Sequence, residues 1–82
     1  MLKKEQVVEK ITERICEIFG KEKSDVSEAT SFVEDLGAKS GNITQITTFL
    51  EDEFEVEIPF MEFRRKKTVG DAAEFVLSLV DE

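Results

Sequence analysis

The sequence contains no histidine, tryptophan or tyrosine, and its only cysteine is Cys16. A single cysteine cannot form a disulfide within the chain. Without histidine or a second cysteine, the usual ligands of a zinc site are missing, so we expect no metal centre. The absence of histidine also removes the commonest general base, and no serine or cysteine has an evident base nearby. We therefore expect no catalytic residues, and we interpret Cys16 as a small, partly buried apolar side chain.

Long hydrophobic runs are absent as well. No apolar stretch approaches the roughly 20 residues that a transmembrane helix needs. The N-terminal residues Met1 to Glu5 become charged at once, which is not typical of a signal peptide. We therefore expect a cytoplasmic protein that does not insert into a membrane.

Positive charge is scarce, because 11 Lys and Arg residues stand against 19 Asp and Glu residues, a net charge of −8. This imbalance argues against binding to nucleic acid or to an anionic membrane surface. It favours partner proteins with basic surfaces, which long-range attraction would steer toward the chain. The one basic run, Arg64–Lys67, is interpreted as a solvated surface that pairs with neighbouring acids, with partner binding as the second interpretation.

The residues that are present fit one small domain over residues 1–82. A chain of 82 residues can fold alone, although a domain near this size buries only roughly 60% of its unfolded surface. Apolar residues make up 40% of the chain and charged residues 37%, which is typical of a globular, largely helical protein. The seven phenylalanines are expected to supply nearly all of the bulky core. We expect the protein to be a monomer.

Apolar residues recur at helical spacing in three segments. The first runs from about Lys3 to Phe19, and Gly20 after it is typical of a helix end. The second runs from about Ser40 to Glu53, and the third from Thr68 to the C-terminus. These segments predict the three main helices of the domain.

A fourth, shorter helical segment is predicted between the second and third helices. Pro59 ends the preceding segment, and the apolar cluster of Phe60, Met61 and Phe63 follows it. No segment alternates apolar and polar residues as a strand does. The sequence therefore predicts an all-α fold, a small bundle of three main helices plus one short helix.

The connection from Lys21 to Lys39 is long, and long connections are usually functional. Ser31–Glu34 matches a capping box and predicts one short helical turn within it. Gly37 is expected to supply a turn just before Ser40. Four apolar residues are expected to hold the connection against the core: Val26, Phe32, Val33 and Leu36.

Ser40 lies where this connection ends and the second helix begins. The first N–H groups of a helix lack partners and the helix dipole favours negative charge there, so a phosphate on the Ser40 hydroxyl would be stabilised. Serine is also a frequent N-cap, in which case its hydroxyl would bond to the helix itself. On the residues alone we favour the cap, with the phosphate site as the alternative.

Acidic residues cluster around the end of the second helix, where they oppose the helix dipole. Because this placement costs stability, it favours a role outside folding, although a solvated acidic surface explains it nearly as well. The residues are Glu51, Asp52, Glu53, Glu55 and Glu57.

The stretch Ser31–Ala38, followed by Ser40, closely resembles the attachment motif of acyl carrier proteins. The resemblance extends over essentially the whole chain and follows the order, length and acidity of that family. It continues at Leu50–Phe54, Glu57–Pro59, Thr68–Val69 and Ala72–Ala73.

The resemblance implies a carrier and not an enzyme. Members of the family bear a 4′-phosphopantetheine arm, joined through a phosphodiester to the serine of an Asp-Ser-Leu motif, and acyl groups ride on the arm's thiol as thioesters. The matching serine is Ser40. The implied partners are a holo-synthase or other phosphopantetheinyl transferase, and acyl-transferring or synthase enzymes of lipid, fatty acid or secondary-metabolite biosynthesis. Basic docking patches on those enzymes would meet the acidic face of the second helix.

The motif differs from the family pattern on both sides of the serine. It reads Lys39-Ser40-Gly41 in place of Asp-Ser-Leu, and two acidic positions of the following helix read Asn42 and Gln45. These differences favour a specialised carrier with its own dedicated enzymes. The alternative is a degenerate carrier fold that lacks the arm and acts as an acidic protein-interaction adaptor.

Overall fold

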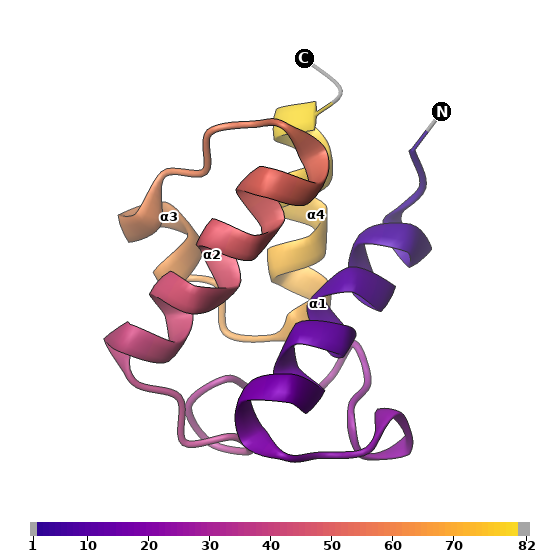
Figure 1. Cartoon of the computed structure of the whole chain (residues 1–82), viewed down its shortest axis with the longest axis vertical. Helices are drawn as coiled ribbons and strands as arrows, with labels where there is room; N and C mark the ends of the chain where they lie inside the picture. Colours follow the sequence, from indigo (N-terminus) through magenta and orange to yellow (C-terminus); the bar gives the residue numbers. More distant parts are fainter. Residues whose placement is uncertain (1, 81–82) are drawn as a thin grey trace.

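Helices make up all the regular structure in residues 2–80, which are the residues that the computed structural model describes. The all-α bundle of three main helices plus one short helix is confirmed, with helix ends within one or two residues of those predicted. The continuation of the last helix to the C-terminus lies partly outside the described residues. The elements are α1 (Lys4–Phe19), the 3₁₀ turn η1 (Lys23–Asp25), α2 (Ser40–Phe54), α3 (Phe60–Arg64) and α4 (Val69–Val80) (Figure 1).

The helix ends follow from local hydrogen bonding. Gly20 ends α1 in the left-handed conformation, with φ of 67°, and its N–H donates to the Cys16 carbonyl at 3.0 Å. Thr68 precedes α4, and its hydroxyl accepts a hydrogen bond from the Asp71 N–H at 3.2 Å. Within residues 2–80, every helix is too short or too polar to cross a membrane.

The core lies where α1 packs against α4 and α2, and where α3 packs against α2 (Figure 1). Among the phenylalanines only Phe32 and Phe63 are buried, with ring centroids 6.0 Å apart. The other buried apolar residues are Val7, Ile11, Ile15, Ile43, Ile46, Leu50, Ile58, Val69, Ala72, Ala73 and Val76.

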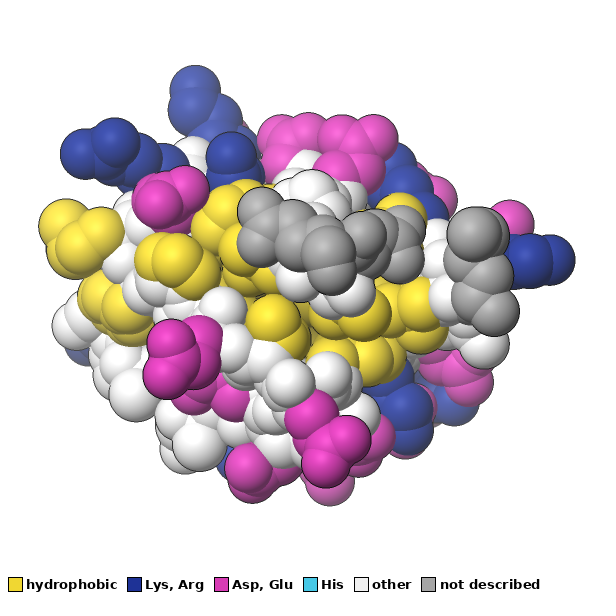
Figure 2. All heavy atoms as spheres, turned by 90° about the horizontal axis from the view of Figure 1, so that it is seen from above, with side chains coloured by type: hydrophobic (Ala, Val, Ile, Leu, Met, Phe, Trp, Pro, Cys, Tyr) yellow, Lys and Arg dark blue, Asp and Glu magenta, His cyan; other side chains and the backbone are white. Residues whose placement is uncertain are grey.

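The expectation that phenylalanine would supply nearly all of the core is therefore wrong. Small and β-branched side chains, such as those of Ala72 and Ala73, allow the helices to approach closely, which leaves less room for aromatic rings between them. Five phenylalanines pack at the edge of the core instead, half-buried. Apolar side chains consequently reach the surface, and Figure 2 shows a band of them across the end of the bundle where both chain ends lie.

An ion-pair cluster joins α1 to the loop after it and to α4. The Lys4 Nζ lies 2.9 Å from Glu28 Oε1 and 3.3 Å from Glu74 Oε1. Hydrogen bonding to Glu28, and then to Glu74, raises the pKa of Lys4 above its usual value of 10.5. All three side chains are partly exposed, so this cluster adds little to the packing that holds α1 and α4 together.

Residues 28–32 of the long loop run antiparallel to residues 67–70, and we call this pairing the loop ladder. The N–H of Gly70 donates to Glu28 O at 2.9 Å, that of Val69 to Thr30 O at 3.0 Å, and that of Phe32 to Lys67 O at 3.1 Å. A Cβ on Gly70 would lie only 3.1 Å from Glu28 O, so glycine allows this close approach. The loop ladder fastens the loop to the start of α4.

A single hydrogen-bonded turn at Ser31–Gly37 follows the loop ladder, which confirms the turn predicted from the capping box. The Ser31 hydroxyl accepts the Glu34 N–H at 3.1 Å, but the Ser31 N–H donates to Asp35 Oδ2 at 2.7 Å and not to Glu34. The Gly37 N–H donates to Val33 O at 3.0 Å. Gly37 itself has φ of 63°, as expected for a glycine that supplies a turn.

The prediction that Val33 helps to hold this loop on the core is wrong. Phe32 is 2% exposed, whereas Val33 is 70% exposed. Successive side chains of a helical turn point about 100° apart, and in this turn Phe32 faces the core while Val33 faces solvent. Val26 and Leu36 pack against the core from its edge, as expected.

The opposite burial of these neighbours gives a paired test of the fold. Phe32→Ala is expected to lower the free energy of unfolding by about 3 kcal/mol or more, because it leaves a cavity against Phe63. Val33→Ala is expected to change it by less than about 0.5 kcal/mol, because the side chain is solvated. Urea unfolding measures both values, and similar losses for the two variants would contradict the turn geometry.

Candidate functional site at the start of α2

Ser40 is the first residue of α2 and is exposed, which confirms the predicted start of this helix. The N-cap is Lys39, in an extended conformation with φ of −106° and ψ of 170°. The interpretation of Ser40 as the N-cap is therefore wrong. Within residues 2–80, the Ser40 hydroxyl has no hydrogen-bond partner, whereas the Ser40 carbonyl accepts the Thr44 hydroxyl at 3.0 Å. The hydroxyl is free for chemistry.

Asn42 supplies the side-chain hydrogen bond at this helix end. Its Oδ1 accepts the Lys39 N–H at 2.9 Å, and the Ile43 N–H donates to the Lys39 carbonyl at 3.0 Å. In the described part of the chain, the N–H groups of Ser40, Gly41 and Asn42 have no acceptor. These groups and the helix dipole make the surroundings of the Ser40 hydroxyl electropositive, and the neighbouring Lys39 adds a formal positive charge.

This arrangement suits an anion linked to the Ser40 oxygen. A phosphodiester there would place its charged oxygens near the free N–H groups of the first turn, as anions at helix N-termini commonly do. Gly41 leaves space beside it, since a Cβ at Gly41 would meet no atom within 4 Å. The residues present therefore fit a phosphate-linked group.

Beyond the first turn, the exposed side of the first half of α2 is polar but uncharged. Thr44, Gln45 and Thr48 border a surface cavity of about 360 Å³ between α1 and α2. The Arg14 guanidinium lies on its α1 side, 5.5 Å from the centroid of the Phe49 ring. Only Asp52, at the far end of this cavity, is acidic.

Two acids near the end of α2 have structural partners. Glu51 Oε2 accepts the Ile58 N–H at 2.9 Å, which holds the chain after α2, and Glu53 Oε2 lies 3.8 Å from Lys10 Nζ. Glu51 and Glu53 therefore have local partners within the fold, and a role of the acidic cluster outside folding stays a prediction. Asp52, Glu55 and Glu57 are exposed.

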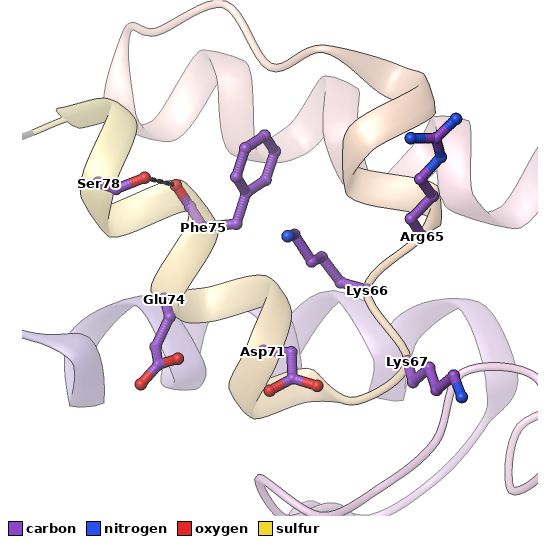
Figure 3. Close-up of a pocket in the computed structure, with 7 residues that line it drawn as sticks. All are labelled: Arg65, Lys66, Lys67, Asp71, Glu74, Phe75 and Ser78. Atoms are coloured by element: carbon purple, nitrogen blue, oxygen red, sulfur yellow. Dashed lines mark hydrogen bonds between the residues drawn. The ribbon is translucent and has the colours of Figure 1, made fainter.

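The basic run Arg64–Lys67 is not locally paired, contrary to the first interpretation of the sequence. The ion pairs within residues 2–80 involve Lys4, Lys10 and Arg14, all on α1. Lys66 lies over the Phe75 ring at 5.0 Å from its centroid, and Figure 3 shows the Asp71 and Glu74 carboxylates pointing away from it. Glu74 is drawn to Lys4 instead. Within the described residues, the positive charges of the basic run are therefore not neutralised by ion pairs.

Residues 9–76 match the protein family described as "Phosphopantetheine attachment site". The matched stretch covers most of the chain and contains the long loop, Ser40, all of α2 and α3, and much of α4. The serine singled out by its place in the sequence, and by its free hydroxyl in the structure, lies within it.

Two substitutions test the local geometry that presents Ser40. Gly41→Ala is expected to raise the free energy of unfolding by up to about 1 kcal/mol, because alanine favours helix and its Cβ meets open space. Asn42→Ala is expected to lower it by about 0.5–1 kcal/mol, because the Lys39 N–H loses its acceptor. Thermal unfolding checks both signs, and a destabilising Gly41→Ala would contradict the open surroundings of this residue.

Proposed function

The chain belongs to the phosphopantetheine attachment family, and on this basis we propose that Ser40 is the residue that bears its 4′-phosphopantetheine group. Attachment of this cofactor is covalent in the family, so the protein is a carrier of what the cofactor bears. We further propose that it is an acyl carrier protein, with acyl or related thioester groups as its cargo.

The single observation that supports Ser40 most strongly is its free, exposed hydroxyl at the N-terminus of a long helix. Three of the other four serines have hydroxyls engaged elsewhere. Those of Ser27 and Ser31 accept backbone N–H groups, and that of Ser78 donates to the Phe75 carbonyl at 2.6 Å. Ser24 lies in the short turn η1, which offers no comparable array of free N–H groups.

The chain's own residues act by position and charge. The N–H groups at the start of α2 and the Lys39 side chain offset the negative charge of a phosphodiester on Ser40. The loop ladder and the turn at Ser31–Gly37 hold Ser40 at the surface, where a partner enzyme can reach it. When attached, the cofactor supplies a flexible arm with a terminal thiol for the cargo. Such a tether raises the effective concentration of the cargo at each partner's active site.

The proposed partners are of two kinds. A holo-synthase or other phosphopantetheinyl transferase attaches the arm, and acyl-transferring or synthase enzymes load and use the cargo in lipid or secondary-metabolite biosynthesis. Asp52, Glu55 and Glu57 are the exposed acids near the end of α2 that would meet basic patches on such enzymes. Because Lys39 and Gly41 replace the usual neighbours of the serine, we propose a specialised carrier with dedicated enzymes. Its proposed location is the cytoplasm.

Co-expression with a broad-specificity phosphopantetheinyl transferase tests the assignment. Intact-mass spectrometry is expected to show the wild-type protein heavier by one phosphopantetheine group, because the Ser40 hydroxyl is free and exposed. Ser40→Ala is expected to show no addition.

Ser78→Ala is the matched control, since it removes another exposed serine hydroxyl and should keep the addition. An addition that persists in Ser40→Ala would overturn the choice of Ser40. A folded wild-type protein that acquires no arm would instead support the alternative, a degenerate carrier fold that acts as an adaptor.

A further inference from the structure

The basic run Arg64–Lys67 stands out because the rest of the protein is strongly acidic. The chain has a net charge of −8, yet these four consecutive side chains have no carboxylate within 4.0 Å among the described residues. Mutual repulsion among adjacent like charges costs folding free energy. Lys66 makes a cation–π contact with the Phe75 ring. Arg65 and Lys67 point away from the cavity in Figure 3. The charge therefore faces solvent without an internal partner.

The same region carries the exposed apolar side chains. Among residues 2–80, the large hydrophobic residues with exposed side chains are Val33, which is 70% exposed, and Met61, which is 58% exposed. Met61 is one helical turn before Arg64 on α3. In Figure 2, basic side chains gather next to protruding hydrophobic ones on the side where α3 lies in Figure 1. An apolar side chain next to unpaired charge offers a protein partner both an apolar and a charged contact.

A surface cavity of about 320 Å³ brings Val33 together with the basic run, and we call it the basic groove. Its cationic side is formed by Arg64, Lys66 and Lys67, and its other side by Ser31, Val33 and Glu34. The loop ladder joins these two sides, since the Phe32 N–H donates to the Lys67 carbonyl at 3.1 Å. The groove is therefore part of the fixed structure.

The basic groove is tied to the loop that presents Ser40. The Gly37 N–H donates to the Val33 carbonyl, and the Ala38 N–H donates to the Phe32 carbonyl at 2.8 Å. Lys39 and Ser40 follow directly in the sequence, and Lys39 adds a positive charge at the start of α2. A partner seated on Val33 would rest on the same rigid turn that leads into the Ser40 helix.

We propose that the basic groove docks an acidic segment of a partner protein, whose carboxylates contact Arg64 and Lys67 and whose apolar side chain contacts Val33. We choose an acidic segment as the partner because of charge complementarity. Such a segment is attracted to this face and repelled by most of the remaining surface. Val33 within the groove offers an apolar contact, which fits a protein side chain better than the phosphates of a nucleic acid. The docking does not require the arm on Ser40, so it can be tested separately from the proposed function.

The probe is a short, fluorescently labelled synthetic peptide of glutamates interrupted by leucines, titrated with the full chain and followed by fluorescence anisotropy at low salt. Amide chemical shifts are expected to change at Val33, Glu34 and residues 64–67 upon binding. The double variant Arg64→Glu with Lys67→Glu is expected to weaken the affinity about tenfold, because two charge contacts become repulsive. Val33→Ala is expected to weaken it severalfold.

The matched control is the same double charge reversal at Lys21 and Lys23, which are exposed and lie outside the groove. It should weaken binding much less than the groove variant, although both change the net charge equally. The groove variant should keep its thermal stability, because it breaks no ion pair and relieves repulsion. Ser40→Ala should bind the peptide as the wild-type protein does.

Equal losses in the two double variants would overturn the proposal, because binding would then depend on net charge alone. Absence of any shift at Val33 or residues 64–67 would also overturn it. So would tighter binding to a single-stranded oligonucleotide or to anionic lipid vesicles than to the peptide, since these outcomes assign the groove to another class of partner.

Discussion

The loop ladder fixes the position of the long connection, and with it the positions of Ser40 and Val33. A connection as long as Lys21–Lys39 would be costly to order, and only a few of its side chains reach the core. The backbone hydrogen bonds between residues 28–32 and 67–70 hold it against the start of α4, and Gly70 makes room for them. Because the turn at Ser31–Gly37 begins where the loop ladder ends, the same pairing determines where Ser40 is presented. It also places Val33 beside the basic run.

Much of this fold could be predicted from the sequence, since helical spacing of apolar residues reports directly on which face of a helix is buried. The side chains of a loop do not point toward the core at any regular spacing. Phe32 and Val33 look alike as apolar residues, and only the hydrogen-bonded turn decides that one enters the core and the other faces water. The prediction that phenylalanines supply nearly all of the bulky core was wrong for a related reason. Composition does not say how closely two helices approach. That distance depends on small residues such as Ala72 and Ala73.

The candidate site was predicted in outline and corrected in detail. The family resemblance pointed to Ser40. In the structure its hydroxyl is free, because Lys39 is the N-cap and Asn42 supplies the capping hydrogen bond. A sequence records how many charges of each sign are present, but not which ones meet. Glu74 pairs with Lys4 across the bundle, so the basic run remains unpaired despite acids nearby in the sequence. Charge on this carrier is thus divided between an acidic end of α2 and a basic groove that Val33 helps to line.

We propose that the free hydroxyl of Ser40 carries the phosphopantetheine arm in the cell. Tandem mass spectrometry of the protein purified from cells that produce it naturally, after proteolysis that separates its serines, tests this most directly. We predict the arm on the peptide that contains Ser40, with fragment ions that place it on that residue. An arm on another serine, or an unmodified Ser40 throughout the purified protein, would contradict this assignment.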